Sequence, residues 1–367
     1  MTTPFAAVET ALAAFREGGI VAVLDDDDRE NEGDLIVAAS LCTPEKMAFV
    51  IRHTSGIVCA PLTVGEARRL RLDPMVAVND APLSTAFTVT VDVRHGLTTG
   101  ISAEERTNTV RALANGNMGA SDFVRPGHVF PLVARPGGVL MRSGHTEAAV
   151  DLCRLAGLPE VGVIGELMND DGTVMRGPTV KAFAERHGLA VLTVADLIAY
   201  RQARERLVER VGEATIQTPI GPARGIAYRT VFEEIEHLAL VFGPVAEPGA
   251  VPARLHRQAL LADTFGDQKT LKAAYARFAR EGRGVLIYLR EGTAGVPAAS
   301  LMGQGGDEGH ASADARRDSW REIGLGAQIL RDLGVSSIKL LSSRSRRFVG
   351  LDGFGITIAS VEPLDTP

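Results

Sequence analysis

Cysteine is scarce in this sequence of 367 residues. Only Cys42, Cys59 and Cys153 are present, and an odd number at wide spacing argues against a disulfide framework and for a reducing cytoplasm. No apolar run approaches the roughly 18 residues that a membrane-spanning helix needs. The start of the chain lacks the basic residues and apolar core of a signal peptide. A formal net charge of −6 gives no sign of a nucleic-acid binder. We therefore expect a cytoplasmic globular protein that binds neither nucleic acid nor a membrane.

The chain is long enough for two domains, and both halves mix strand and helix patterns. We therefore expect an α/β protein of mixed α+β type. In the first half, the expected strands are residues 19–24, 87–93 and 190–193, and the expected helices are 43–53, 146–156 and 196–206. Thr43 reads as a helix N-cap, Thr63 and Ser102 begin capping-box patterns, and Gly157 is placed to end a helix.

The second half gives the same mixture. The expected strands are residues 238–242, 284–289 and 337–341, and the expected helices are 269–280 and 324–333. The charged segment 201–213 lacks a broad apolar face and marks the expected domain boundary. We therefore divide the chain into domains 1–205 and 206–367.

An acidic loop follows the first expected strand. Residues 25–34 read DDDDRENEGD, so seven of the ten are carboxylates. This loop is either a solvated charge run or a site for a hard divalent cation, which prefers oxygen ligands. A calcium EF-hand is excluded because the sixth loop position is Glu30 instead of glycine. The remaining metal option is Mg²⁺ or Mn²⁺, and composition does not say which acid binds it.

Two residues are candidates for proton transfer. His128 lies in RPGHVFPL, which reads as a loop between two proline-containing turns. It is either a hydrogen-bonded structural residue or a base whose ordinary pKa is close to neutral pH. Glu166 interrupts an apolar stretch in GVIGELMNDDG. It is either a carboxylate in apolar surroundings with a raised pKa, or an exposed acid at a strand end.

Residues 138–146 read GVLMRSGHT and precede an expected helix. This order predicts a strand, a turn of small residues and a helix N-terminus, whose free N–H groups suit a phosphate. Arg142 and Thr146 can add donors, and His145 can bind a metal through a ring nitrogen. The alternative is an ordinary capped helix with Arg142 in a surface ion pair.

Taken in order, these segments resemble 3,4-dihydroxy-2-butanone 4-phosphate synthase of riboflavin biosynthesis. DRENEGD, RPGHVFPL and GHTEA are highly specific as a set, and IRHTSGIVC, FTVTVDV, LTTGISAEERTNTVRAL and ELMNDDGT extend the likeness over nearly all of residues 5–205. The resemblance implies that the N-terminal domain has the fold of this synthase family. Ser143 stands where the common pattern has glycine.

The resemblance also implies roles for individual residues. Glu30 and His145 match the family's metal ligands, and His128 and Glu166 match residues needed for catalysis. The residues that match substrate contacts are Arg29, Glu30, Asp34, Arg142, Ser143, Gly144, His145, Thr146 and Glu166. The implied reaction converts ribulose 5-phosphate to the butanone phosphate and formate, with Mg²⁺ or Mn²⁺, two ions per active site. Family members are homodimers with the active site near the subunit interface, so we expect a homodimer.

The second half resembles GTP cyclohydrolase II in GRGVLIYLRE, GLGAQILRDLGVSSIKLL and VGLDGFGI. The resemblance implies a GTP cyclohydrolase II-like αβ domain. The family's three zinc-binding cysteines are missing, since the corresponding stretch reads RLHRQALLADTFGDQKTL. The family's nucleotide-binding segment appears as REGTAGVPA, its Asp-x-Arg as Ser319-Trp320-Arg321, and its TNNP-x-K as SSRSRR. We therefore expect a non-catalytic domain without zinc.

Three alternatives for the second half stay open. A bifunctional enzyme would also hydrolyse GTP. A substitute metal site would use His256 with Asp263 or Asp267. A non-enzymatic domain would support the dimer, sense a ligand or bind another enzyme of the riboflavin pathway.

Overall fold

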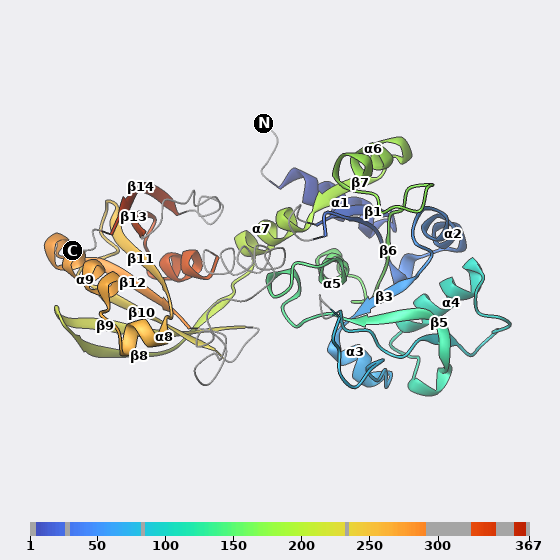
Figure 1. Ribbon diagram of the computed structural model, residues 1–367, viewed down its shortest axis with the longest axis horizontal. Coiled ribbons are helices and arrows are strands. Elements are labelled where there is room, and N and C mark those ends of the chain that lie inside the picture. Colours follow the sequence, from blue (N-terminus) through green and yellow to red (C-terminus); the bar gives the residue numbers. More distant parts are fainter. Residues whose placement is uncertain are drawn as a thin grey trace. The chain divides into compact units, whose positions relative to one another are not determined.

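The computed structural model describes residues 5–25, 30–81, 85–231, 235–290, 324–342 and 356–364. Contacts divide the chain into two compact units, Met1–Tyr200 and Arg201–Pro367. Each unit is built around one seven-stranded sheet with helices beside it, which confirms the expected mixed α/β class (Figure 1). Within the described residues, no helix is both long and apolar enough to cross a membrane.

The first unit alternates short strands with helices. Its strands are β1 (Val21–Leu24), β2 (Gly33–Ala38), β3 (Cys59–Leu62), β4 (Val91–Val93), β5 (Phe123–Val133), β6 (Gly162–Glu166) and β7 (Ala190–Thr193). Its helices are α1 (Ala6–Arg16), α2 (Pro44–His53), α3 (Val64–Arg69), α4 (Ala103–Leu113), α5 (His145–Ala156) and α6 (Gly177–His187), and α7 (Val194–Arg204) runs across the boundary between the units.

Local capping fixes where several helices begin. The Thr43, Thr63 and Ser102 side chains accept the N–H groups of Lys46, Glu66 and Glu105, as the sequence predicted. Gly157 ends α5 in the left-handed conformation, with φ of 74°.

The first sheet has strand order β4-β5-β3-β6-β2-β1-β7. One face is covered by α2, α4 and α6, whose side chains share two apolar clusters with alternate residues of β1, β2, β3 and β6. Helix α5 packs on β2, β3 and β6 and also contacts α1. A Cβ atom added to Gly162 of β6 would meet Ala149 of α5, so α5 covers the opposite face. Because side chains alternate along a strand, Asp34 and Glu166 lie on the α5 face.

Three local expectations are corrected. The expected strand 87–93 is reduced to Val91–Val93. The preceding residues bond to two different segments, since the Thr88 N–H donates to Pro131 O and the Val89 N–H donates to Asp73 O. His128 lies within strand β5 instead of a loop. The strand tolerates Pro131, which has no N–H to donate, because its carbonyl accepts the Thr88 N–H from the neighbouring segment.

The third correction concerns the segment before α5. Residues Gly138–Leu140 form a 3-10 turn instead of a strand. Gly137 and Gly138 have φ of 91° and 63°, which a strand does not allow. The turn is held in place by Val139 N–H, which donates to the buried Asp151 of α5 at 2.9 Å.

The second unit has sheet order β14-β13-β11-β12-β10-β9-β8. Its elements are β8 (Val208–Thr218), β9 (Gly221–Thr230), β10 (Glu236–Phe242), β11 (Val251–Arg257), α8 (Leu260–Thr264), α9 (Lys269–Glu281), β12 (Gly284–Leu289), a helix at 324–332, β13 (Ser337–Ser342) and β14 (Thr357–Pro363). The strands expected near 238–242, 284–289 and 337–341 are present. Strand β8 was missed because nearly all its residues are at least partly exposed, so no alternation marks it.

We predict that Gly127→Ala destabilises the first unit. A Cβ atom at Gly127 would overlap the backbone of Val91 and Asp92, so strands β4 and β5 would have to separate. Overpacking of this kind typically costs about 1–3 kcal/mol, and the thermal unfolding midpoint should fall by several degrees. Gly116→Ala is the control, because a Cβ atom there meets nothing within 4 Å. Equal midpoints for the two variants would contradict the close approach of the strands.

Candidate active site

The acidic loop connects the antiparallel strands β1 and β2, in which Leu24 lies opposite Gly33. Asp25, which is buried, holds the loop together: its carboxylate accepts the N–H groups of Glu30 (3.2 Å) and Glu32 (2.9 Å), and its own N–H donates to Glu32 O. The sequence did not single out Asp25, because composition alone does not distinguish among the five aspartates of the loop. Arg29 lies outside the described residues.

The start of α5 lies beside this loop. Gly144 is the N-cap residue, Ser143 before it is half-buried, and His145 and Thr146 are buried in the first turn. The N–H groups of a first helical turn have no partner within the helix and favour an anion.

Arg142 is held next to this turn by two side chains. It donates to Glu147 at 2.8 Å and to Thr85 at 3.1 Å. Glu147 is itself buried and accepts the Arg135 N–H at 2.9 Å. The Arg142 guanidinium is therefore positioned by the helix whose N-terminus it flanks, and the alternative of a surface ion pair is wrong, since its partner Glu147 is buried.

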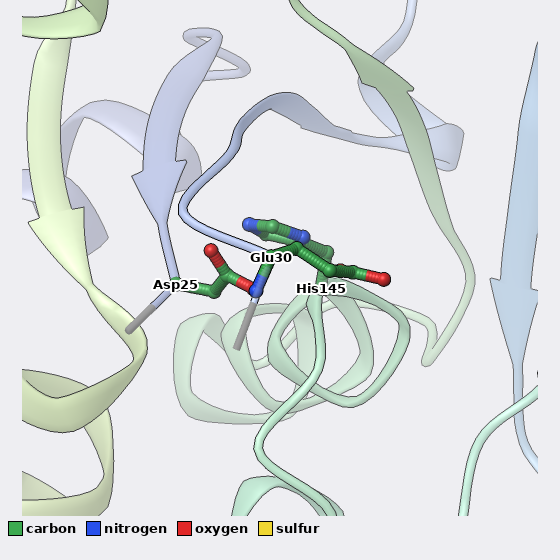
Figure 2. Close-up of side chains that lie close together, drawn as sticks. All are labelled: Asp25, Glu30 and His145. Carbon is green, nitrogen blue, oxygen red and sulfur yellow. The ribbon is translucent and has the colours of Figure 1, made fainter. Parts of the chain in front are cut away.

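Asp25, Glu30 and His145 come together as a cluster that could hold a metal ion. Each offers one ligand atom, and these atoms all lie within 4.8 Å of one another. Figure 2 shows the three side chains converging from the end of β1, the acidic loop and the first turn of α5. Two carboxylates with one imidazole suit a hard divalent cation that keeps some of its water.

Asp34 extends this cluster into the protein. Its carboxylate is buried and lies 3.5 Å from His145 Nδ1. Burial raises the Asp34 pKa well above its usual value, and the charges of Glu166 and Glu30 raise it further. Carboxylates crowded in this way repel one another, so a divalent cation among them would relieve the repulsion. The residues present therefore fit such a cation.

Glu166 lies directly across the sheet from Asp34, in the antiparallel pairing of β6 with β2. It is the last residue of β6 and is exposed, so the second of its two predicted environments is correct. Ser55 fixes it from the other side: the Ser55 hydroxyl donates to the carboxylate at 3.1 Å, and the Ser55 N–H donates to the Glu166 carbonyl at 2.9 Å.

His128 is paired with a residue that sequence reasoning missed. Asp92, buried on β4, accepts the His128 main-chain N–H at 2.9 Å and contacts the ring Nδ1 at 2.7 Å. The available signal was the lone acid in the alternating FTVTVDV, at a position facing the protein. With Nδ1–H donating to Asp92, the lone pair of the ring is on Nε2.

Within the described residues, the hydrogen bonds of His128 go to Asp92 and not to the acidic cluster. Cys59 of β3 lies between Phe130 of β5 and Ile164 of β6. His128 is two residues before Phe130 and Glu166 is two after Ile164, so both lie at the same edge of the sheet. Two strand spacings, about 10 Å, separate their backbones, and the His128 ring is hydrogen-bonded to Asp92.

The second unit contains the proposed substitute metal residues. His256 Nε2 lies 3.0 Å from both oxygens of Asp263, which also accepts hydrogen bonds from the Tyr288 hydroxyl (2.7 Å) and the Ala259 N–H (2.8 Å). Asp267 instead pairs with Lys269 at the surface. The Asp263 oxygens are thus used by protein donors. Ser319-Trp320-Arg321 and nearly all of REGTAGVPA and SSRSRR lie outside the described residues.

Two family models match the chain in succession. The model described as 3,4-dihydroxy-2-butanone 4-phosphate synthase matches residues 9–200, and that described as GTP cyclohydrolase II matches residues 209–363. The riboflavin biosynthesis protein RibBA of Salinispora arenicola is 48% identical, with 97% of this chain and 88% of the relative covered. The RibBA of Mycobacterium tuberculosis H37Rv is 47% identical over the same shares.

Solved structures agree with these matches. RibBX from A. baumannii, described as a two-domain 3,4-dihydroxy-2-butanone 4-phosphate synthase, is 41% identical with a TM-score of 0.81, covering 97% of this chain and 98% of that one. A 3,4-dihydroxy-2-butanone 4-phosphate synthase in complex with two magnesium ions is 47% identical with a TM-score of 0.53, covering 54% of this chain and 97% of its own. The chain therefore belongs to the 3,4-dihydroxy-2-butanone 4-phosphate synthase family, with a GTP cyclohydrolase II-family domain in its second half.

Proposed function

We propose that this chain converts D-ribulose 5-phosphate to 3,4-dihydroxy-2-butanone 4-phosphate and formate in riboflavin biosynthesis, using a divalent metal. The observation that carries the proposal is the convergence of Asp25, Glu30 and His145 at the first turn of α5. A cation site beside a helix N-terminus suits a substrate that has both vicinal oxygens and a phosphate. Three buried free cysteines fit a cytoplasmic enzyme.

Glu30 and His145 are the proposed metal ligands, with Asp25 as a third candidate. Mg²⁺ or Mn²⁺ fits the donor set, and the related structure with two magnesium ions supports two ions per site. The bound metal supplies a Lewis acid for the sugar oxygens. The N–H groups around Ser143, Gly144 and Thr146, together with Arg142, are the proposed phosphate contacts, and Arg29, Asp34 and Glu166 are proposed to contact the sugar.

Proton transfers are assigned to His128 and Glu166. Asp92 orients the His128 ring, so that Nε2 can take a proton from a substrate carbon. Glu166 is exposed to substrate and is held by Ser55. Phosphate binding at a distance positions the reacting carbons between these groups.

We further propose a homodimer in which His128 serves the site of the partner chain. His128 and Glu166 are two strand spacings apart within one chain, or about 10 Å. Ile57, two residues before strand β3, is 49% exposed. Ile101 is 52% exposed and follows Gly100, where an added Cβ atom would lie 2.7 Å from His128 Nδ1. Large apolar side chains exposed around a catalytic residue favour a covering subunit.

The second domain is proposed to be non-catalytic and without zinc. The second domain contains no cysteine. The Asp263 carboxylate, which could have replaced a cysteine as a zinc ligand, instead accepts hydrogen bonds within the protein. The roles left for it are support of the dimer, sensing of a ligand and binding of another riboflavin-pathway enzyme.

We predict that Glu30→Gln and His145→Gln abolish metal-dependent catalysis. Loss of a ligand removes charge stabilisation worth several kcal/mol, so kcat/KM should fall by on the order of a thousandfold. EDTA should inactivate the wild-type protein, and Mg²⁺ or Mn²⁺ should restore it. Formate release from ribulose 5-phosphate is the measurement. Glu104→Gln, an exposed acid on α4, is the control. Near-normal activity of Glu30→Gln would refute the metal assignment.

The shared site predicts complementation between two inactive variants. The His128→Ala and Glu30→Gln variants are dissociated or unfolded, mixed at equal concentrations, and allowed to reassociate. In the mixed dimer one of two sites has both residues, so random mixing should recover about a quarter of the wild-type activity. Each variant reassociated with itself is the control. No recovery, in a mixture shown to contain mixed dimers, would place His128 in the site of its own chain.

The second domain predicts no turnover of GTP. The purified chain should release no pyrophosphate from GTP, with or without added Zn²⁺, while the same preparation forms formate from ribulose 5-phosphate. Zinc-dependent pyrophosphate release would instead establish the bifunctional alternative.

A further inference from the structure

Two histidines from different helices lie next to each other in the first unit, with their rings tilted. His53 is the last residue of α2 and His187 is the last residue of α6, and their ring centroids are 5.2 Å apart with an interplanar angle of 51°. His53 is half-buried and His187 is exposed, so solvent reaches the pair from one side. Neither residue has a part in the catalytic arrangement described above.

Aromatic packing fixes where both rings lie. Each histidine packs on a phenylalanine one turn earlier in its own helix, with centroids 4.5 Å apart for Phe49–His53 and 4.4 Å for Phe183–His187. The two phenylalanines also contact each other across the helices at 6.1 Å. Phe183 is buried in the apolar cluster shared by α2 and α6. The imidazoles are therefore held at their separation by a rigid base.

The separation suits two ligands of one metal ion. With metal–nitrogen bonds of about 2.0–2.1 Å and a tetrahedral angle, the centroids of two imidazole ligands lie about 5 Å apart. The observed separation of 5.2 Å agrees with this value.

The electrostatic surroundings leave a neutral imidazole available. Burial lowers the His53 pKa, the nearby His187 and Arg52 lower it further, and only Asp170 acts in the opposite direction. A neutral ring has the lone pair that a metal requires. Asp170 also contributes a negative charge close to the pair, which partly offsets the Arg52 charge.

We propose that His53 and His187 form a second metal site, specific for a transition-metal cation such as Ni²⁺, Zn²⁺ or Cu²⁺, with water completing the coordination. Imidazole suits these ions, whereas Mg²⁺ prefers oxygen ligands and is directed to the acidic cluster. The two sites thus differ in ligand chemistry: the acidic cluster offers mainly oxygen ligands, whereas the histidine pair offers nitrogen ligands alone and would not hold Mg²⁺.

An ion at this site would join two elements that each support the acidic cluster. The His53 carbonyl accepts the Met168 N–H at 3.1 Å, and Ser55, two residues on, holds Glu166. On the other helix, Val180 packs against Gly33 so closely that a Cβ atom there would be 2.6 Å from a Val180 methyl group. Clamping α2 to α6 would therefore stiffen the supports of both Glu166 and the acidic loop.

The test is Ni²⁺ titration of the full-length protein by calorimetry, in excess Mg²⁺ to occupy the acidic cluster. The wild-type chain is expected to bind one Ni²⁺ per subunit at this site. His187→Gln should weaken that binding at least about tenfold, because one of two imidazole ligands is lost. His53→Gln should have the same effect. His95→Gln is the matched control, since His95 is an exposed histidine paired with Asp122 elsewhere.

The variant Glu30→Gln separates this site from the acidic cluster. Its Ni²⁺ affinity should equal that of the wild-type chain. Loss of Ni²⁺ binding in Glu30→Gln, unchanged binding in His187→Gln, or no Ni²⁺ binding by the wild-type chain would each overturn the proposal. Because His187 is exposed, its substitution should leave the fold intact, and circular dichroism of each variant is the check.

Discussion

Crowding of carboxylates at one end of the neighbouring strands β2 and β6 is the constraint on which the first domain depends. Antiparallel pairing of β2 with β6 places Asp34 opposite Glu166, and the turn from β1 adds Asp25 and Glu30 beside the start of α5. Burial raises the pKa of Asp34, and the like charges of Glu166 and Glu30 raise it further. A cation bound there and the N-terminus of α5 would offer compensating positive charge. The proposed binding of metal and of sugar phosphate would thus relieve the same repulsion.

Local signals in the sequence were enough for much of the fold. Thr43, Ser102 and Gly157 act through neighbours within a few residues, and their helices begin or end where predicted. The sequence patterns gave wrong predictions where contacts with residues far along the chain determine the local structure. The 3-10 turn at Gly138–Leu140 depends on Asp151, and the short strand β4 depends on how Asp73 and Pro131 divide the backbone of the preceding residues. Neither contact can be recognised from the periodicity of apolar residues in the sequence.

The same distinction applies to the site. The acidic loop and GHT turn were identified by residue type, and the resemblance to the family assigned Glu30 and His145 as metal ligands. Asp25 and Asp92 were missed because their importance lies in backbone amides and a ring nitrogen that only the tertiary structure brings near them. In the second domain, residue type indicated a lost zinc site, but the His256–Asp263–Tyr288 hydrogen bonds could not be read from the spacing of these residues.

Asp92 binds both the main chain and the ring of His128, and it does so from an edge strand of three residues. Short edge strands open at a lower free energy than the rest of a sheet. Each such opening would release the imidazole from its tautomer and its direction at once. The enzyme would then lose the base proposed for it through fraying of one strand, while the remaining six strands stay paired. Heat inactivation would accordingly begin as a local event and precede the unfolding of the domain.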